Sequence, residues 1–282
     1  MSDTGASIAS ASGRVVIVTG GGSGIGAAVA QAAAANGDTV VIAGRRREAL
    51  ERTRDAAGTA EVRGRIHPIP ADLARPDEID RLVAETVRTH GRLDGVVANA
   101  GTMVTGTVAE TSAADWQRAV DVNLTAAFLL AKHAIPHLRA TKGAVVAVGS
   151  IAGLRATNGA AAYAISKSAL GMLVASIAVE EAQHGIRANC VNPGWVRTEM
   201  ADAEMDEFGA HTNQTREQAY ASVTQLVPTR RPAEPDEVAS AIRWLLGPES
   251  TYVNGASLTV DGGTTMVDPG TAGFDFTITP RG

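Results

Sequence analysis

Short apolar runs alternate with longer, helix-like segments along most of the chain. Seven of these runs have the length of strands, at residues 14–20, 39–44, 65–72, 93–101, 143–150, 186–194 and 256–263. Most are apolar at consecutive positions rather than at every second position, which is typical of strands covered on both faces. The pattern therefore predicts strands that lie inside a covered sheet.

The segments between these runs carry helix start and stop signals. Segment 25–37 ends in Asn36-Gly37, and segment 76–91 begins with Pro76 followed by two acidic residues. Strands covered on both faces that alternate with helices indicate a parallel sheet between two helix layers. We predict an α/β fold: a single doubly wound domain with a seven-stranded parallel sheet.

The alternation continues over residues 14–265 without a linker, so we expect one domain with two extensions. Residues 1–13 lack the charged and apolar regions of a signal peptide and are expected to form a disordered leader. Residues 266–282 are expected to form a C-terminal extension. The polar, acidic segment 199–227 departs from the pattern, and we expect it to form short helices of a substrate loop.

Charge and cysteine content narrow the class of protein. The 282 residues include 25 basic and 30 acidic side chains, for a net charge of −5. Because no basic block exceeds three residues, we expect no nucleic-acid partner. The single cysteine, Cys190, excludes a disulfide scaffold, favours a cytoplasmic location and is interpreted as a small buried apolar residue. No apolar run approaches 18 residues, so no membrane span is expected.

The sequence TGGGSGIG at residues 19–26 lies between the first strand and the first helix. Glycines in such a loop allow the backbone to approach a pyrophosphate, and the helix N-terminus supplies N–H donors and the positive end of its dipole. The strand–loop–helix context therefore predicts dinucleotide binding. No Gly-Lys-Ser/Thr follows, which excludes the nucleoside-triphosphate loop.

The loop pattern TGxxxGxG resembles that of the short-chain dehydrogenase/reductase family, and further motifs follow in the order found in that family. They are ANAG (98–101), DVN (121–123), Ser150 at the end of the fifth strand, YAISK (163–167), PGWVRT (193–198) and VDGG (260–263). The resemblance covers roughly residues 14–265. It implies a Rossmann-type fold and an NAD(P)-dependent enzyme that interconverts a ketone and a secondary alcohol.

Tyr163 and Lys167 are four residues apart, which places them on one face of a helix. Tyrosine has a pKa near 10, and an ammonium at about 4 Å attracts the phenolate by about 4 kcal/mol at an effective dielectric near 20. We therefore expect Lys167 to lower the pKa of Tyr163 toward the range useful for acid–base catalysis. The resemblance implies that Tyr163 transfers the proton, that Ser150 binds the substrate oxygen, and that Asn123 holds a water beside Lys167.

The resemblance also implies a cofactor site at the carboxyl ends of the strands. Its expected residues are Gly20, Ser23, Gly24, Ile25, Gly26, Asp72, Leu73, Asn99, Ala100, Gly101, Tyr163, Lys167, Pro193, Gly194, Val196 and Thr198. Ala98 departs from the family, which often has a second asparagine there. We expect this difference to affect strand packing more than chemistry.

The run AGRRRE at residues 43–48 ends the second strand and bears on the choice of cofactor. NAD sites place an acid about 20 residues past the glycine loop, and the residue in that position is Gly44. Arg45 follows and can bind a 2′-phosphate, while Arg46 assists and Arg47 faces solvent. Ser23 argues the other way, because many NADP-binding relatives have a basic residue there. We expect NADP to be preferred, otherwise NAD.

Other signals are interpreted as structural. His133 and His137 have the spacing of a zinc-binding pair, but Pro136 interrupts the predicted helix and no third ligand lies nearby, so no metal site is expected. The acidic run at 201–208 is interpreted as a solvated face. Trp195 is expected either to shape the pocket or to pack.

The predicted function is oxidoreduction of a small, neutral, fairly apolar substrate, and residues 102–104 with segment 199–227 are expected to select it. Two alternatives remain: a 3-oxoacyl reductase acting on the acyl carrier protein, and a dinucleotide-binding sensor without turnover. Glu180 and Glu181 argue against docking of an acidic carrier. The retained Ser150, Tyr163 and Lys167 argue against a sensor. The resemblance also implies a homodimer or homotetramer.

Overall fold

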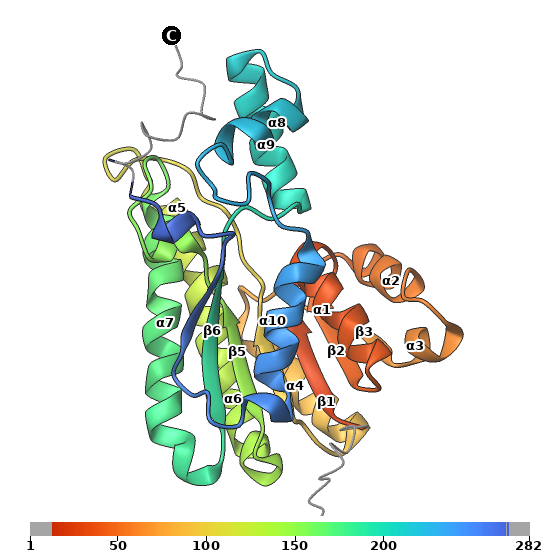
Figure 1. Ribbon diagram of the computed structural model, residues 1–282. Helices are drawn as coiled ribbons and strands as arrows, with labels where there is room; N and C mark the ends of the chain where they lie inside the picture. Colours follow the sequence, from red (N-terminus) through yellow and green to blue (C-terminus); the bar gives the residue numbers. More distant parts are fainter. Residues whose placement is uncertain (1–12, 269, 271–282) are drawn as a thin grey trace, which may run out of the picture.

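A seven-stranded, all-parallel sheet forms the centre of the computed structural model, which describes residues 13–268 and 270 (Figure 1). Its strands are β1 (Val15–Thr19), β2 (Thr39–Gly44), β3 (Ile66–Pro70), β4 (Gly95–Ala98), β5 (Ala144–Val148), β6 (Arg187–Pro193) and β7 (Ser257–Val260). Their order across the sheet is β3-β2-β1-β4-β5-β6-β7. Each strand lies inside one of the apolar runs, so the predicted sheet is confirmed.

Helices connect the strands. They are α1 (Gly24–Ala35), α2 (Arg47–Asp55), α3 (Ala60–Gly64), α4 (Pro76–His90), α5 (Ala113–Val120), α6 (Ala126–Thr141), α7 (Ala161–Glu181), α8 (Glu199–Thr212), α9 (Arg216–Val223) and α10 (Pro235–Leu246). A π-helical turn, η1 (Asp121–Thr125), joins α5 to α6, and a 3-10 turn, η2 (Ile151–Gly153), follows β5. Helix α4 starts at Pro76 as predicted, and Gly91 ends it in the left-handed conformation with φ 74°.

The apolar side chains form one large buried cluster on each face of the sheet. One cluster contains residues of α1 and α10, and the other contains residues of α4, α6 and α7. Most strand residues, including Ile17, Val18, Val96 and Val97, are almost fully buried. This double coverage is why the strands are apolar at consecutive positions, and it confirms the predicted layers of the α/β fold.

Helix α6 runs through Pro136, although the sequence analysis took that proline as an interruption. A proline removes one backbone hydrogen bond from a helix interior. Here Leu130, Ala134 and Leu138 pack into the core on both sides of it. Packing of this apolar face therefore outweighs the local preference, and the helix continues to Thr141.

The order in which strands are added to the sheet reverses next to β1. Strand β1 pairs with β2 on one side and with β4 on the other, and the connections after β3 cross to the second half of the sheet. In open parallel sheets a ligand crevice forms at such a reversal, outside the carboxyl ends of the strands. Thr19 at the end of β1 and Asn99 just after β4 meet there: the Thr19 side-chain oxygen accepts from the Asn99 amide nitrogen at 3.1 Å.

Segment 199–227 forms helices α8 and α9, which stand above the carboxyl ends of the strands (Figure 1). They pack mainly against each other, with Ala201, Met205, Ala219 and Tyr220 in a small core of their own. The Thr198 side chain accepts a hydrogen bond from the Ala201 amide at 3.2 Å and starts α8 as its N-cap. The substrate-loop interpretation thus falls on a helical hairpin beside the predicted crevice.

Both expected extensions lie largely outside the described residues, at 1–12 and at 269 and 271–282.

The expectation that no segment could span a membrane needs one correction. Segment Ala161–His184, which contains α7, is long and apolar enough to cross a membrane by length and composition. Half of its most apolar window is buried inside the protein. Leu170, Val174 and Ile177 belong to the core, which accounts for much of this apolar character.

Candidate active site

The glycine loop between β1 and α1 leaves no room for side chains at several positions. Gly20 and Gly24 have φ of 66° and 52°, a conformation that favours glycine. A Cβ on Gly20 would lie 2.8 Å from the side-chain nitrogen of Asn99, and one on Gly26 would collide with the Gly20 carbonyl oxygen. The backbone is therefore bare where it faces the crevice and leads into the N-terminus of α1, which fits a pyrophosphate.

Asn99 fixes the shape of this loop. Its side-chain nitrogen donates to the carbonyl oxygens of Thr19 at 2.9 Å and of Gly20 at 3.3 Å. The Thr19 hydroxyl in turn donates to the Val97 carbonyl at 3.1 Å and accepts from the Ala100 amide at 3.2 Å. The ends of β1 and β4 are thus tied together by side chains, and the position predicted for the cofactor becomes rigid.

Tyr163 and Lys167 lie on the first turns of α7 and face the end of β5, where Ser150 follows. The Lys167 nitrogen is 5.9 Å from the centre of the Tyr163 ring and donates to the Val148 carbonyl at 2.8 Å. Lys167 is only 5% exposed, and burial lowers its pKa to about 8. The Ser150 hydroxyl, which accepts from the Ala152 amide at 3.1 Å, also forms a hydrogen bond with Tyr163.

The pKa of Tyr163 does not follow the expectation drawn from the sequence. Burial raises it above its ordinary value, the hydrogen bond with Ser150 acts in the opposite direction, and the charge of Glu204 raises it further. Lys167 is not among the groups that shift it, and its nitrogen donates to the Val148 carbonyl instead. The phenol is therefore protonated at neutral pH, the form needed to donate a proton to a ketone oxygen.

Asn123 lies in the π-helical turn η1 and is 1% exposed. Its side-chain oxygen accepts from the Thr102 amide at 2.7 Å, while its nitrogen donates to the Thr102 carbonyl at 3.1 Å and to the Ser166 hydroxyl at 2.9 Å. The side chain therefore ties the loop after β4 to α7. Turns of this type recur at functional sites, because the extra residue redirects side chains.

Most of the predicted residues line one cavity of about 530 Å³ at the carboxyl ends of the strands. They are Gly20, Ser23, Gly24, Ile25, Asn99, Ala100, Gly101, Ser150, Tyr163, Lys167, Pro193, Gly194, Val196 and Thr198. Gly101 lies against Lys167, since a Cβ there would be 3.2 Å from the Lys167 nitrogen. The cavity thus joins the glycine loop to Tyr163, as a dinucleotide with a reactive nicotinamide requires.

Five predicted residues do not line this cavity: Gly26, Arg45, Asp72, Leu73 and Asn123. Gly26 lies beneath the glycine loop, and Asn123 is buried behind Thr102. Asp72 and Leu73 follow β3, and the Asp72 side chain accepts from the Ala74 amide at 3.1 Å. Arg45 follows β2 and is exposed.

The three arginines at the end of β2 differ in their partners. Arg46 donates to Glu199 of α8 at 2.8 Å, and Arg47 pairs with Glu51 at 3.7 Å. Arg45 has no hydrogen bond or ion pair within the described part of the chain. A Cβ on Gly44 would meet only Leu50, at 3.7 Å, so this position has room for a side chain.

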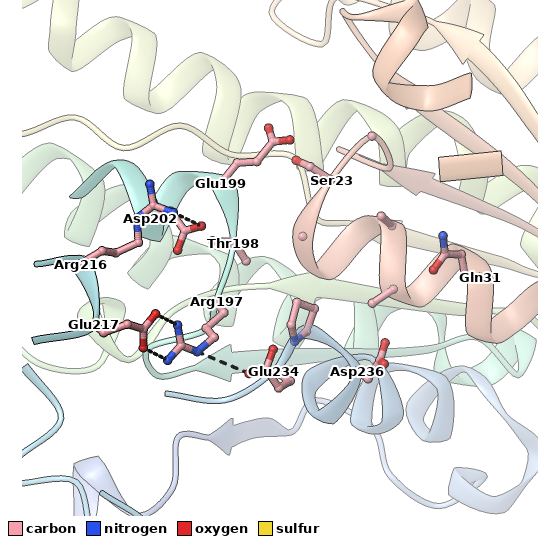
Figure 2. Close-up of a pocket in the computed structure, with 15 residues that line it drawn as sticks. Ser23, Gln31, Arg197, Thr198, Glu199, Asp202, Arg216, Glu217, Glu234 and Asp236 are labelled. Carbon is pink, nitrogen blue, oxygen red and sulfur yellow. Dashed lines mark hydrogen bonds and ion pairs between the residues drawn. The ribbon is translucent and has the colours of Figure 1, made fainter. Parts of the chain in front are cut away.

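A second, open pocket of about 590 Å³ lies between α1 and the start of α8, α9 and α10 (Figure 2). Arg197 lines it and donates to Glu217 of α9 at 2.7 and 2.8 Å, with Glu234 at 3.4 Å on its other side. Arg216 pairs with Asp202 at 3.3 Å. Because both of its arginines are paired with carboxylates, we interpret this pocket as the base of the α8–α9 hairpin.

The structure adds residues on the substrate side that sequence reasoning had missed or left undecided. They are Thr105, Ile151, Ala152, Thr157, Asn158, Trp195, Met200, Ala201 and Glu204. Of the residues 102–104 expected to select the substrate, Met103 lines the cavity whereas Val104 is buried in the core. Glu204 belongs to the acidic run interpreted as solvated, and only helical periodicity from Met200 could have placed it inside.

The remaining sequence signals are structural. Cys190 is completely buried in β6, and burial raises the pKa of its thiol to about 11, so it is not a nucleophile. His133 lies 3.1 Å from Asp80. Across residues 13–268 and 270, no group of three or more His, Cys, Asp and Glu side chains could hold a metal ion.

Comparison with known proteins gives one consistent answer. A family model described as enoyl-(acyl carrier protein) reductase matches residues 20–265. Protein MoaE of Klebsiella aerogenes is 37% identical over 261 residues, which cover 93% of this chain and 99% of that protein. Meso-2,3-butanediol dehydrogenase of Serratia marcescens is 33% identical over 255 residues, covering 90% and 96%.

Solved structures agree with these relatives. Levodione reductase superposes with a TM-score of 0.84 at 29% identity, covering 90% of this chain and 98% of that one. A variant of actinorhodin polyketide ketoreductase with NADPH gives a TM-score of 0.82 at 31% identity, covering 89% and 97%. The chain is therefore an oxidoreductase that acts on CH–OH groups with NAD(P), and it belongs to the short-chain dehydrogenase/reductase family.

Proposed function

We propose that this enzyme interconverts a ketone and a secondary alcohol in a small substrate, with Tyr163, Ser150 and Lys167 as catalytic residues. The observation that carries the proposal is their convergence on one cavity that also contains the glycine loop. Separate packing roles for these three side chains would not require them to share a cavity with a bare, rigid backbone at a helix N-terminus.

The cofactor would be held by the glycine loop, Asn99, Gly101 and Lys167, and when bound it supplies or accepts the hydride. Tyr163 donates its phenolic proton to the substrate oxygen during reduction and recovers it during oxidation. The Ser150 hydroxyl donates to the same oxygen, where negative charge develops in the transition state. Lys167 remains largely protonated at neutral pH and places a positive charge beside these groups.

We propose NADP as the preferred cofactor. Support comes from the end of β2, where Gly44 provides no carboxylate and Arg45 is exposed without a partner in the described structure. A guanidinium in this position can bind a 2′-phosphate with two hydrogen bonds. Ser23 supplies no additional positive charge, and Arg46 is already paired with Glu199. The proposed preference for NADP therefore depends on Arg45.

Several relatives have names that refer to small hydroxylated compounds. They include meso-2,3-butanediol dehydrogenase and L-fucose dehydrogenase of Bos taurus, which is 34% identical over 252 residues, covering 89% of each chain. The cavity walls are partly apolar, with Met103, Ile151 and Met200, and partly polar. Both points support a small substrate that carries hydroxyl groups.

Reduction of a carrier-bound acyl chain is the second candidate, favoured by the description of the matching family model. Its acidic partner would need a basic surface near the cavity. The hairpin over the cavity instead carries Glu199, Asp202 and Asp206. Glu181 is tied to Arg139 by hydrogen bonds of 2.7 and 2.8 Å, which leaves Glu180 as the exposed acid on α7. We therefore favour a free small molecule as the substrate. We also propose that the enzyme acts in the cytoplasm.

We also propose a homo-oligomer, a dimer or a tetramer. Ile165, Met172 and Val179 are spaced seven residues apart on α7 and are 51%, 71% and 83% exposed. This spacing places them in one stripe along the helix. Phe128 on the neighbouring α6 is 49% exposed. Exposed apolar side chains grouped in this way mark an interaction surface.

A substrate screen tests the proposed function. Purified enzyme with NADPH or NADH is mixed with a panel of small ketones, and loss of nicotinamide fluorescence is followed, with the alcohols tested in the reverse direction. The proposal predicts turnover of at least one pair. Cofactor binding without turnover of any compound would support the sensor instead, and turnover confined to carrier-bound substrates would support the second candidate.

A further inference from the structure

Helix α8 presents two different faces. Met200, Ala201 and Glu204 follow each other at helical spacing, and all three line the cavity that contains Tyr163. Asp202 and Asp206 lie on another face and pair with Arg216 of α9 at 3.3 and 2.6 Å. The acidic run is therefore split: two carboxylates hold the hairpin together, and one, Glu204, lines the substrate side of the cavity.

Glu204 is only partly exposed and has no hydrogen bond or ion pair within the residues that the structure describes. Burial, and secondarily the charge of Glu207, raise its pKa to about 7. Glu204 and Tyr163 line the same cavity, and the charge of Glu204 raises the pKa of Tyr163. A carboxyl group with free acceptor oxygens thus lines the cavity that contains the proposed proton donor.

We propose that Glu204 selects substrates in which a second hydroxyl group lies near the reacting carbinol or ketone, and that it accepts a hydrogen bond from that hydroxyl. The inference rests on the proposed function, because it places the second hydroxyl relative to Tyr163.

The chemistry of the cavity favours a neutral hydroxyl over a charged group. A substrate that fills the cavity displaces water from Glu204, and without a donor it leaves a carboxyl group unsatisfied. Sites built to bind a hydroxyl reject analogues that lack it much more strongly than apolar sites reject added groups. Lys167 supplies the only ammonium or guanidinium that lines the cavity in the described structure, so Lys167 and Glu204 balance each other.

The test compares matched alcohols: cyclohexanol with the cis and trans isomers of 1,2-cyclohexanediol, and 2-butanol with 2,3-butanediol. The amino alcohol 2-aminocyclohexanol forms a third arm. The kcat/KM of each is measured for the parent, for Glu204→Gln and for Glu204→Leu. Glu180→Gln is the control, because it removes an exposed acid that does not line the cavity. Cofactor binding, followed by nicotinamide fluorescence, shows that each variant is folded.

We expect the parent to prefer a diol over its mono-alcohol by about tenfold to a hundredfold, the range for a hydrogen bond to a charged group. Glu204→Leu should remove this preference while retaining activity on the mono-alcohol, and Glu204→Gln should retain part of it. Glu180→Gln should behave like the parent.

Three results would overturn the inference: equal parent activity on both members of each pair, a diol preference that survives in Glu204→Leu, or a preference for the amino alcohol over the diols. The last would show selection of a cation. Failure of the proposed function looks different, because the parent would then turn over neither these alcohols nor any ketone of the screen.

Discussion

At the scale of single residues, Tyr163 combines a raised pKa with a hydrogen bond from its partner Ser150. Oxidation requires the phenolate, and kcat/KM reports the ionisation of the free enzyme. Because burial and Glu204 raise the pKa of Tyr163, we expect kcat/KM for alcohol oxidation to rise from about pH 7 toward about pH 10. Reduction uses the phenol and should stay level over the neutral range.

The Glu204→Gln variant provides the control for this pH profile. It removes the negative charge that raises the pKa of Tyr163, so the rise in oxidation should begin at lower pH. The other ionisable groups that line the cavity or adjoin it, Lys167 and Cys190, are unchanged in this variant. An oxidation rate that has already reached its plateau at about pH 7 in the parent would contradict the raised pKa.

Cofactor choice is also decided by single residues. Arg45→Ala should lower kcat/KM for NADP by about tenfold or more and leave that for NAD unchanged. The reason is that only NADP carries the 2′-phosphate that Arg45 would bind. Gly44→Asp should shift the ratio toward NAD by about tenfold or more through repulsion of the phosphate. The measurement is the ratio of the two catalytic efficiencies.

Arg47→Ala is the matched control, since Arg47 belongs to the same run and pairs with Glu51. A parent enzyme that already favours NAD would refute the assignment, as would an unchanged ratio in Arg45→Ala. Arg45 would then be ordinary surface charge.

The predictability of these residues depends on what positions them. The residues of the glycine loop and Asn99 were predictable, because bare backbone and a rigid turn require particular residue types at fixed spacing. Glu204 was not, because a carboxylate in an acidic helix carries no sequence mark of the face it lies on. The pKa of Tyr163 was predicted in the wrong direction, because burial, and to a smaller extent the charge of Glu204, raise it.

At the scale of elements, the α8–α9 hairpin has its own small core and few contacts with the rest of the domain. Elements of this kind open at low free-energy cost and often close over substrates. We expect amide hydrogens of residues 199–227 to exchange faster than those of the sheet in the free enzyme, and to become protected when cofactor and a substrate analogue bind. Hydrogen exchange followed by mass spectrometry measures both.

Substitution of Arg197 tests the stability of the hairpin independently of the cavity. It links the loop after β6 to Glu217 and Glu234. Arg197→Ala should speed exchange in α9 without changing exchange in β1 or β4. Equal protection of 199–227 in the free and bound enzyme would argue against closure.

The elements differ in how far the sequence predicted them. The strands and α4 were predicted closely, because burial on both faces and a start at Pro76 leave clear patterns. Two features were not predicted: the passage of α6 through Pro136, where core packing overrides local preference, and the π-helical turn that holds Asn123. The latter depends on hydrogen bonds to Thr102 and Ser166, which no local pattern reveals.

At the scale of the whole molecule, the exposed apolar stripe on α7 predicts association of copies. The Met172→Glu substitution places a charge in the middle of the stripe and should convert the proposed oligomer into smaller species. Light scattering after size-exclusion chromatography measures the mass. Val108→Glu, at an apolar position that is 81% exposed elsewhere, serves as the control and should leave the mass unchanged. A monomeric parent would rule out the oligomer.

The central claim for the whole molecule is that one cavity combines dinucleotide binding with proton transfer by Tyr163. Turnover and cofactor binding of the Tyr163→Phe variant test it most directly, because only the phenolic oxygen is removed. We predict that kcat falls by about a thousandfold, within the range of general acid–base catalysis, while NADPH binds with an affinity close to that of the parent. A variant that keeps activity within about tenfold of the parent would contradict the account.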